Sequence, residues 1–324
     1  MGGRGMTRDS IWISIRLHRF ELITFALASV AAIAAALWIV ASLDALDVTK
    51  ACLVDVATGA PGPMCDRIQQ QFNEIAYGRA GSVLLFLDLL PVIAGLILGA
   101  SIVGREVERG TTRLAWSLTP ARLPWFLERA IPPLVVLIVL SLLVGLAADW
   151  MAAAKSPGID VSAAFVDRGT RGLALLGYAV AAFGLGAGAG AVIGRELPGF
   201  VLALVGVVGV VIVVSRFDNV VLRAEAVARD SGNGSGSAYQ VDLYMDQMFR
   251  LPDGSLVSWE QAYPNGQEID TDGNPVNPLP MVDIIVPGDR YSFVSARTAA
   301  EFALVGLGGL VVAGAAATKR GPGS

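Results

Sequence analysis

The chain has 324 residues, of which 54% are hydrophobic and 16% are charged, and its formal net charge is -4. Soluble domains carry roughly 25% charged residues. The low charge content, the mean hydropathy of +0.61 and the long apolar blocks exclude a soluble enzyme, a disordered chain and a nucleic-acid-binding protein. The composition predicts an all-α polytopic membrane protein with one modest polar domain.

The N-terminal stretch, residues 1–21, precedes the first apolar run. Trp12, Arg16 and Arg19 are spaced i, i+4, i+7, which places them on one face of a helix. This pattern predicts an amphipathic helix in the plane of the membrane interface; the alternative is a positively charged flank of the first span. The first apolar run is too long for a signal peptide and no clean cleavage site closes it, so we expect it to stay in the membrane.

Six apolar segments follow, most of them near the ~20 residues that cross a ~30 Å hydrocarbon core. The third begins with Pro132 and Pro133, which we expect in the first turn of its helix, where missing N–H groups cost little. A very short break, residues 195–199, separates the fourth from the fifth, which is short, rich in valine and expected to extend a few residues at either end. The predicted spans are Leu22–Ser42, Ser82–Gly104, Ala130–Ala148, Gly172–Gly194, Phe200–Val214 and Ala299–Thr318.

The distribution of basic residues predicts the orientation. Lys and Arg are about two and a half times as dense in residues 1–21, 105–129, 195–199 and 319–324 as in the remaining connecting segments. By the positive-inside rule, both termini are expected to be cytoplasmic. The transmembrane region is then residues 22–214, followed by an extracytoplasmic segment, residues 215–298, and by the sixth helix with a short cytoplasmic tail, residues 299–324.

Two outer segments are long. The first, residues 43–81, contains the only cysteines, Cys52 and Cys65, and a disulfide between them is plausible in an oxidising compartment; two unpaired thiols are the alternative. In residues 215–298, the turn at 252–254 predicts a short hairpin between residues 248–251 and 256–257. For the rest of that segment we expect a compact cap with little regular structure.

Signals for catalysis are missing from the sequence. The single histidine, His18, excludes a histidine-based metal cluster or a histidine-containing triad within one chain, and no phosphate loop of the form G-x-x-x-x-G-K-[ST] is present. We therefore expect no catalytic residue, no metal site and no cofactor bound by this chain. A glycine series within the fourth span favours close helix packing over a dinucleotide loop; its members are Gly184, Gly186, Gly188, Gly190 and Gly194.

Two carboxylates, Asp88 and Glu301, fall within predicted spans. Intramembrane acids are costly and commonly face a cavity or a partner, so both are candidate functional residues. The structural alternative is snorkelling, or pairing with Arg79, Arg171 or Arg297.

The cytoplasmic segment 105–129 contains paired charges followed by Gly110, where we expect the second membrane helix to end. Thr111 or Thr112 could cap a short helix beyond it. Trp116 and Trp125 favour a docking surface for a cytoplasmic partner, because large aromatic residues commonly anchor interfaces. The alternative is a solvated loop with ion pairs.

At these residues the chain resembles permease subunits of the ABC-2 type of ATP-binding-cassette exporters, particularly the actinobacterial ones. The similarity after the second span consists of Arg105, Glu106, Glu108, Gly110, Thr111, Arg113, Leu114, Ala115 and Trp116, with Arg122 and Trp125 downstream. Further similar positions are Trp12, Arg16, His18 and Arg19; Pro91, Gly95, Gly99 and Ala100; and Pro287, Asp289, Arg290, Tyr291, Phe293 and Glu301.

The resemblance implies a noncatalytic, multi-pass subunit of a bacterial cytoplasmic membrane. Two permeases, identical or homologous, would pair with two separate ATP-binding subunits, which would hold ATP and Mg²⁺. The segment around Glu106–Trp116 would be the coupling helix that transmits closure of the ATP-binding subunits to the spans, and export would run along a path between the permeases. Two other functions stay open from the residues alone: an ion-coupled secondary transporter using Asp88 and Glu301, and a membrane sensor whose residues 215–298 bind a ligand.

Overall fold

A computed structural model describes residues 8–48, 52, 65–110, 122–231, 241–264 and 279–319. The chain divides into two compact units. The helical unit lies within Met1–Pro157, Asp167–Val214 and Ser295–Ser324, and the sheet unit within Gly158–Val166 and Ser215–Val294.

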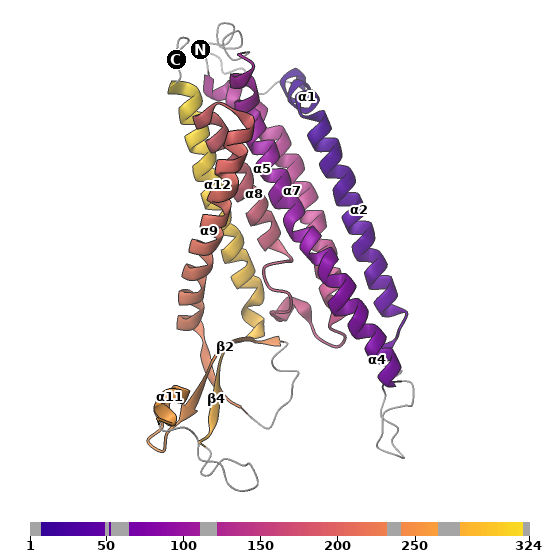
Figure 1. Ribbon diagram of the computed structural model, residues 1–324, viewed down its shortest axis with the longest axis vertical. Helices are drawn as coiled ribbons and strands as arrows, with labels where there is room; N and C mark the ends of the chain where they lie inside the picture. Colours follow the sequence, from indigo (N-terminus) through magenta and orange to yellow (C-terminus); the bar gives the residue numbers. More distant parts are fainter. Residues whose placement is uncertain are drawn as a thin grey trace. The chain divides into compact units, whose positions relative to one another are not determined.

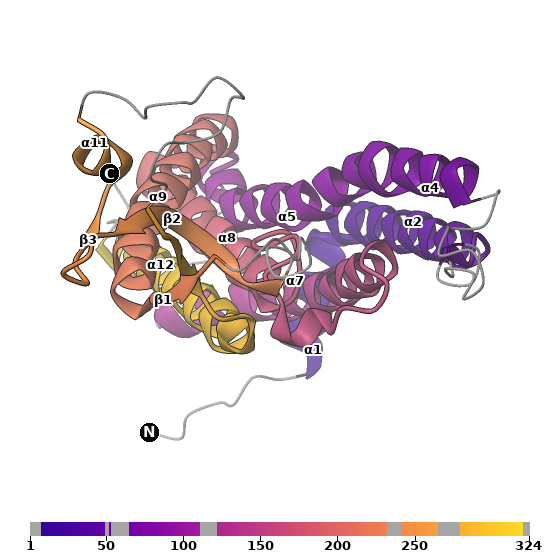
Figure 2. The ribbon, with the colours of Figure 1, turned by 90° about the horizontal axis from the view of Figure 1, so that it is seen from below.

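Within the described residues, six helical segments are long and apolar enough to cross a membrane. The finding confirms an all-α polytopic membrane protein, and in the helical unit α2, α5, α7 and α8 lie side by side (Figures 1 and 2). The six segments are α2 (Arg19–Asp44), the continuous run α4 (Cys65–Asn73), π-helical η1 (Glu74–Arg79) and α5 (Ala80–Glu108), then α7 (Arg122–Lys155), α8 (Leu173–Ile193), α9 (Glu196–Glu225) and α12 (Tyr291–Lys319).

The third span starts earlier than its apolar core. Because α7 begins at Arg122, Pro132 and Pro133 lie well inside the helix, and their predicted place in its first turn is wrong. A proline has no N–H to donate to the carbonyl four residues earlier, so Pro133 leaves the Arg129 carbonyl without its helical donor. The Ser14 hydroxyl of α1 (Arg8–Leu17) donates to that carbonyl at 3.0 Å. The proline thus creates the site that fixes α1 to α7.

The N-terminal helix is separate from the first span. It ends at Leu17, and α2 begins at Arg19 after His18, whose φ of -103° and ψ of 15° are not helical. Trp12 and Arg16 share a face as predicted, with the guanidinium carbon 5.0 Å from the indole centroid. Arg19 belongs to the next helix, so the single face predicted for all three residues is interrupted.

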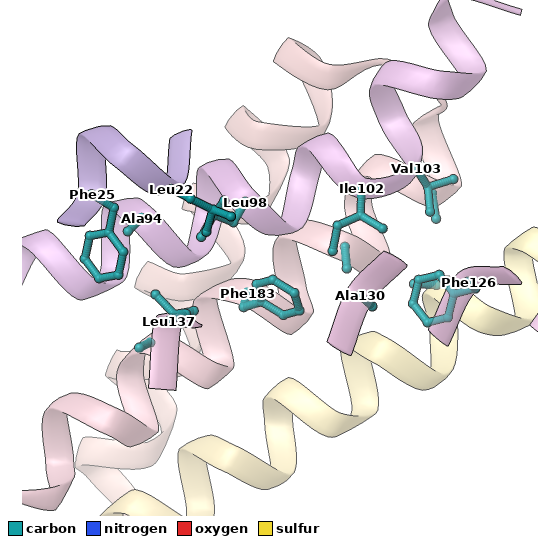
Figure 3. Packing of buried hydrophobic residues seen from close by; sticks show 14 of the residues in the cluster. Leu22, Phe25, Ala94, Leu98, Ile102, Val103, Phe126, Ala130, Leu137 and Phe183 are labelled. Atoms are coloured by element: carbon teal, nitrogen blue, oxygen red, sulfur yellow. The ribbon is translucent and has the colours of Figure 1, made fainter. Parts of the chain in front are cut away.

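The main core of the helical unit surrounds Phe183 of α8. Figure 3 shows Phe183 among Leu98 and Ile102 of α5 and Leu137 and Ala130 of α7. These side chains are buried within the protein. Packing between the helices therefore stabilises the bundle, because lipid supplies little hydrophobic driving force for helix association.

The glycines of α8 allow main chains to approach closely on two sides, which confirms the predicted packing role. On one side a Cβ built at Gly190 would lie 2.5 Å from the Ala100 carbonyl oxygen of α5. On the other side a Cβ at Gly188 would lie 3.0 Å from the Gly309 carbonyl oxygen of α12. Helix α8 is therefore held between α5 and α12 by residues without side chains.

The sheet unit contains four antiparallel strands in the order β1-β4-β2-β3. The hairpin β2–β3 pairs Phe249 with Val257 and Arg250 with Leu256, which confirms the predicted hairpin. The expectation of a cap with little regular structure is wrong. The fifth span, α9, extends to Glu225, further than the few residues expected beyond Val214. The strands are β1 (Val227–Asp230), β2 (Leu243–Arg250), β3 (Leu256–Val257) and β4 (Met281–Val286).

A segment distant in sequence completes the sheet unit. The Phe165 N–H donates to the Val241 carbonyl at 2.9 Å, and the Phe165 ring meets the Tyr291 ring edge to face at 5.6 Å. Asp242 accepts from the Gly288 N–H at 2.8 Å and pairs with Arg229. Residues 158–166 therefore belong with the strands, although α7 and α8 flank them in the chain.

Cys52 and Cys65 are joined in a disulfide, the pairing expected from their shared segment; their Cα atoms are 4.9 Å apart and their sequence separation is 13. Replacing Cys52 with Ser is expected to lower the free energy of unfolding by about 3 kcal/mol, because the unfolded chain regains the freedom of the closed loop. Thermal unfolding with and without reductant measures this. Cys65→Ser and the double variant should match Cys52→Ser, and unequal losses would contradict the interpretation.

Candidate functional site

The charges of the helical unit converge at the end where α5 finishes and α9 begins. The Arg105 guanidinium of α5 is the centre: its Nη2 lies 2.5 Å from Glu21 Oε1 of α2 and 2.7 Å from Glu196 Oε1 of α9. Its Nε also donates to Glu196 Oε2 at 3.0 Å, which makes the second bridge bidentate. The side chains of Arg105 and Glu21 are 25% and 16% exposed, so water screens these pairs only partly.

The main chain brings α5 and α9 together at this point. A Cβ added to Gly104 would lie 3.2 Å from the Glu196 Cα, so this glycine permits the close approach that the bidentate bridge requires. Glu108 accepts a hydrogen bond from the Glu196 N–H at 3.1 Å. A carboxylate at the first turn of α9 also faces the positive end of the helix dipole, which favours this arrangement.

A second ion pair joins α5 to α7. Arg129 Nη1 lies 3.1 Å from Glu106 Oε1, and both side chains are at least four-fifths buried. The Arg129 guanidinium carbon also lies 4.7 Å from the centroid of the buried Trp125 ring. The acids and bases at this end form what we call the charged cluster: Glu21, Arg105, Glu106, Glu108, Arg129 and Glu196.

His18 lies under the charged cluster, at the break between α1 and α2. Its ring is 5% exposed and its Nδ1 is 3.3 Å from the Ser101 hydroxyl of α5. Burial lowers the pKa of His18, the nearby Arg105 and Arg129 lower it further, and Glu21 and Glu196 oppose the shift. The neutral ring is therefore the form that the folded protein favours.

The lowered pKa of His18 predicts the direction of a pH effect. The unfolded chain takes up the His18 proton near its ordinary pKa of about 6.5, while the folded protein resists it, so stability falls as the pH drops below that value. We expect the melting temperature to fall more between pH 7.5 and pH 5.5 in the natural protein than in His18→Gln. Equal losses in both proteins would show that other groups cause the pH dependence.

The predicted coupling residues fall into two groups. Arg105, Glu106 and Glu108 lie in the last turns of α5, and all three are engaged with residues of this chain. Gly110 follows with a φ of +70° and open space around it, so the helix ends where predicted. Thr111, Arg113 and Trp116 lie outside the described residues.

Three members of the charged cluster were not identified from the sequence: Glu21, Arg129 and Glu196. A usable signal was present, because each is a charged residue at the edge of an apolar span, and Glu196 is the only acid in the short break 195–199. What the sequence could not show is that α2, α5, α7 and α9 bring these edges together.

The two candidate intramembrane acids lie on different helices, Asp88 on α5 and Glu301 on α12, and both are partly buried. Of the three arginines suggested as partners for Asp88 and Glu301, two form ion pairs with other acids. Arg79 pairs with Glu74 at 3.2 Å, and Arg171 pairs with Asp149 at 3.0 Å. In the part of the chain that the structure describes, His, Cys, Asp and Glu form no group of three or more that could hold a metal ion.

Comparison with known proteins gives one match. A family model described as ABC-2 membrane transporter related matches residues 26–217, which include the helices from α2 to most of α9. No curated protein and no solved structure matches the chain.

Proposed function

Since the chain belongs to the ABC-2 membrane transporter related family, a family of transporter permeases, we propose that it is the membrane-spanning subunit of an ATP-driven exporter. Its part is noncatalytic. Two such permeases, identical or homologous, form the translocation path, and two separate ATP-binding subunits hold ATP and Mg²⁺ and hydrolyse the nucleotide. The density of Lys and Arg supports an orientation with both termini in the cytoplasm, and the resemblance to ABC-2 permeases supports a bacterial cytoplasmic membrane location.

The observation that carries the proposal is the position of Arg105 immediately before the predicted coupling segment. Arg105 is three residues before the end of α5 at Glu108 and bridges two other spans, through Glu21 and Glu196. A force applied to the chain beyond Gly110 therefore reaches α2 and α9 through charged hydrogen bonds as well as α5 directly. The Glu106–Arg129 pair extends the same connection to α7.

This geometry suggests how ATP could bias the permease. The two conformations of a transporter must differ in their contacts with the ATP-binding subunits for nucleotide to favour one of them. We propose that the coupling segment around Glu106–Trp116 makes those contacts, and that the charged cluster moves α2, α5, α7 and α9 as one group when the ATP-binding subunits close. Opening the path on one side and closing it on the other would follow from that motion.

Cysteine crosslinking tests this assignment. The natural cysteines are joined to each other, so a cysteine introduced at Thr112 supplies a free thiol. We expect Thr112→Cys to crosslink to the ATP-binding subunit that co-purifies with this chain, in a yield that changes when ATP is added. Ser82→Cys, on an exposed position near the other end of α5, is the matched control and is expected not to crosslink. Equal crosslinking from both positions would contradict the docking assignment.

A further inference from the structure

A groove between α2 and α5 is not used by the proposed coupling mechanism. It has a volume of about 340 Å³, within the ~300–1,000 Å³ range of ligand sites. Its walls are apolar: Phe20, Phe25 and Ala28 come from α2, and Ile93 and Ile97 from α5. Phe20, Ile93 and Ile97 are also partly open to the outside of the bundle, so the groove faces the surroundings of the helices.

The length of the groove matches one leaflet of a bilayer. Its lining extends from Phe20 to Ala28 along α2, and eight residues of helix rise about 12 Å. Half of a ~30 Å hydrocarbon core is of similar depth. The groove begins at the charged end of α2 and extends toward the middle of the span, which is the course of an acyl chain.

The charge at the groove entrance favours an anionic headgroup. Among the described lining residues Glu21 is the charged one, and it is paired within the protein: it shares the Arg105 guanidinium, at 2.5 Å, with Glu196. The exposed Arg19 has its guanidinium carbon 4.8 Å from the centroid of the Phe20 ring, which itself lines the groove. An exposed cation therefore lies at the entrance of the apolar groove. Basic sites between membrane helices are known binding places for anionic lipid headgroups.

We propose that this groove binds one anionic phospholipid of the leaflet next to the charged cluster. One acyl chain lies along Ala28 and Ile97, and the phosphate is held by Arg19. Because α2 and α5 both contribute to the groove and to the charged cluster, the lipid would contact the helices that Arg105 holds together. The inference concerns a lipid bound by the permease and does not depend on the exported substrate.

The test uses the purified full chain in a zwitterionic detergent, with melting temperature followed as lipid is added. We expect dioleoylphosphatidylglycerol to stabilise the protein and dioleoylphosphatidylcholine, which has the same acyl chains, to have a much smaller effect. Arg19→Gln should weaken the apparent affinity for phosphatidylglycerol about fivefold, the equivalent of one basic residue near an anionic lipid. Arg195→Gln, which removes an exposed arginine from the same end of the helical unit, should leave that affinity unchanged.

A second variant tests the apolar groove independently of the charge on Arg19. Ala28→Phe fills the groove and should remove the preference for phosphatidylglycerol; if that protein does not fold, Thr24→Phe at an exposed lining position replaces it. Glycerol 3-phosphate, which carries the phosphate without acyl chains, should not stabilise the natural protein. The proposal is overturned if both lipids stabilise equally, if glycerol 3-phosphate is as effective as the lipid, or if Arg19→Gln and the groove-filling variant bind phosphatidylglycerol as the natural protein does.

Discussion

Replacing Arg105 with Met is expected to destabilise the helical unit by roughly 2–3 kcal/mol, because Glu21 and Glu196 lose their common partner in a partly buried place. The side chain of Arg105 is 25% exposed, so we expect a smaller loss of stability than for a fully buried ion pair. Arg105→Lys should recover only part of it, since an ammonium group keeps the charge but cannot form the bidentate bridge to Glu196. Thermal unfolding in detergent measures both.

The control for Arg105 is Arg195→Met, which removes the same charge from an exposed position one residue before Glu196 and is expected to change little. A double-mutant cycle with Glu196→Gln separates the bridge from general effects. The two substitutions should be non-additive by about 1 kcal/mol or more, because they remove the same interaction. Strict additivity would show that Arg105 and Glu196 do not stabilise one another.

Gly99→Ala is expected to have the largest effect on folding, a loss above about 3 kcal/mol. A Cβ at this position would collide with the Phe183 carbonyl of α8 and would lie 2.9 Å from the Ala187 nitrogen. Both obstacles are main-chain atoms of α8, so relief requires α5 and α8 to move apart. We expect a lower yield of monodisperse protein and a lower melting temperature.

Gly81→Ala is the matched control, because it makes the same change in the same helix at a place with nothing within 4 Å of the added Cβ. It should be neutral or stabilise by about 0.5–1 kcal/mol, since alanine favours the helix over glycine. If Gly99→Ala were as stable as Gly81→Ala, the close approach of α5 and α8 would be wrong.

The sequence predicts the spans well because the apolar blocks are long and the bilayer fixes their length. Element ends were less predictable. The helix α7 begins at Arg122 and continues through Pro132 and Pro133. Ser14 donates to the Arg129 carbonyl, which Pro133 leaves without a helical donor, and this contact joins residues 115 positions apart in sequence. No local pattern around the prolines indicates such a distant partner.

The candidate site was also predictable only in part, because its contacts join residues that are distant in sequence. The charges before Gly110 indicated that the second membrane helix ends in a functional segment. Their partners Glu21 and Glu196 are distant in sequence, and only the packing of α2, α5 and α9 brings them to Arg105. In the sheet unit, β1 and β2 contain charged residues and lack a clear alternation, so the local pattern did not predict strands there.

The most direct test of the account is the ATP hydrolysis rate of the complex in lipid nanodiscs, with the co-purified ATP-binding subunit bound. We predict that the natural permease changes this rate relative to the ATP-binding subunit alone, and that Glu196→Gln reduces the change while the complex stays assembled. Arg195→Met should behave as the natural protein. The account is contradicted if no complex forms, or if the assembled complex hydrolyses ATP at the same rate with the natural permease and with Glu196→Gln.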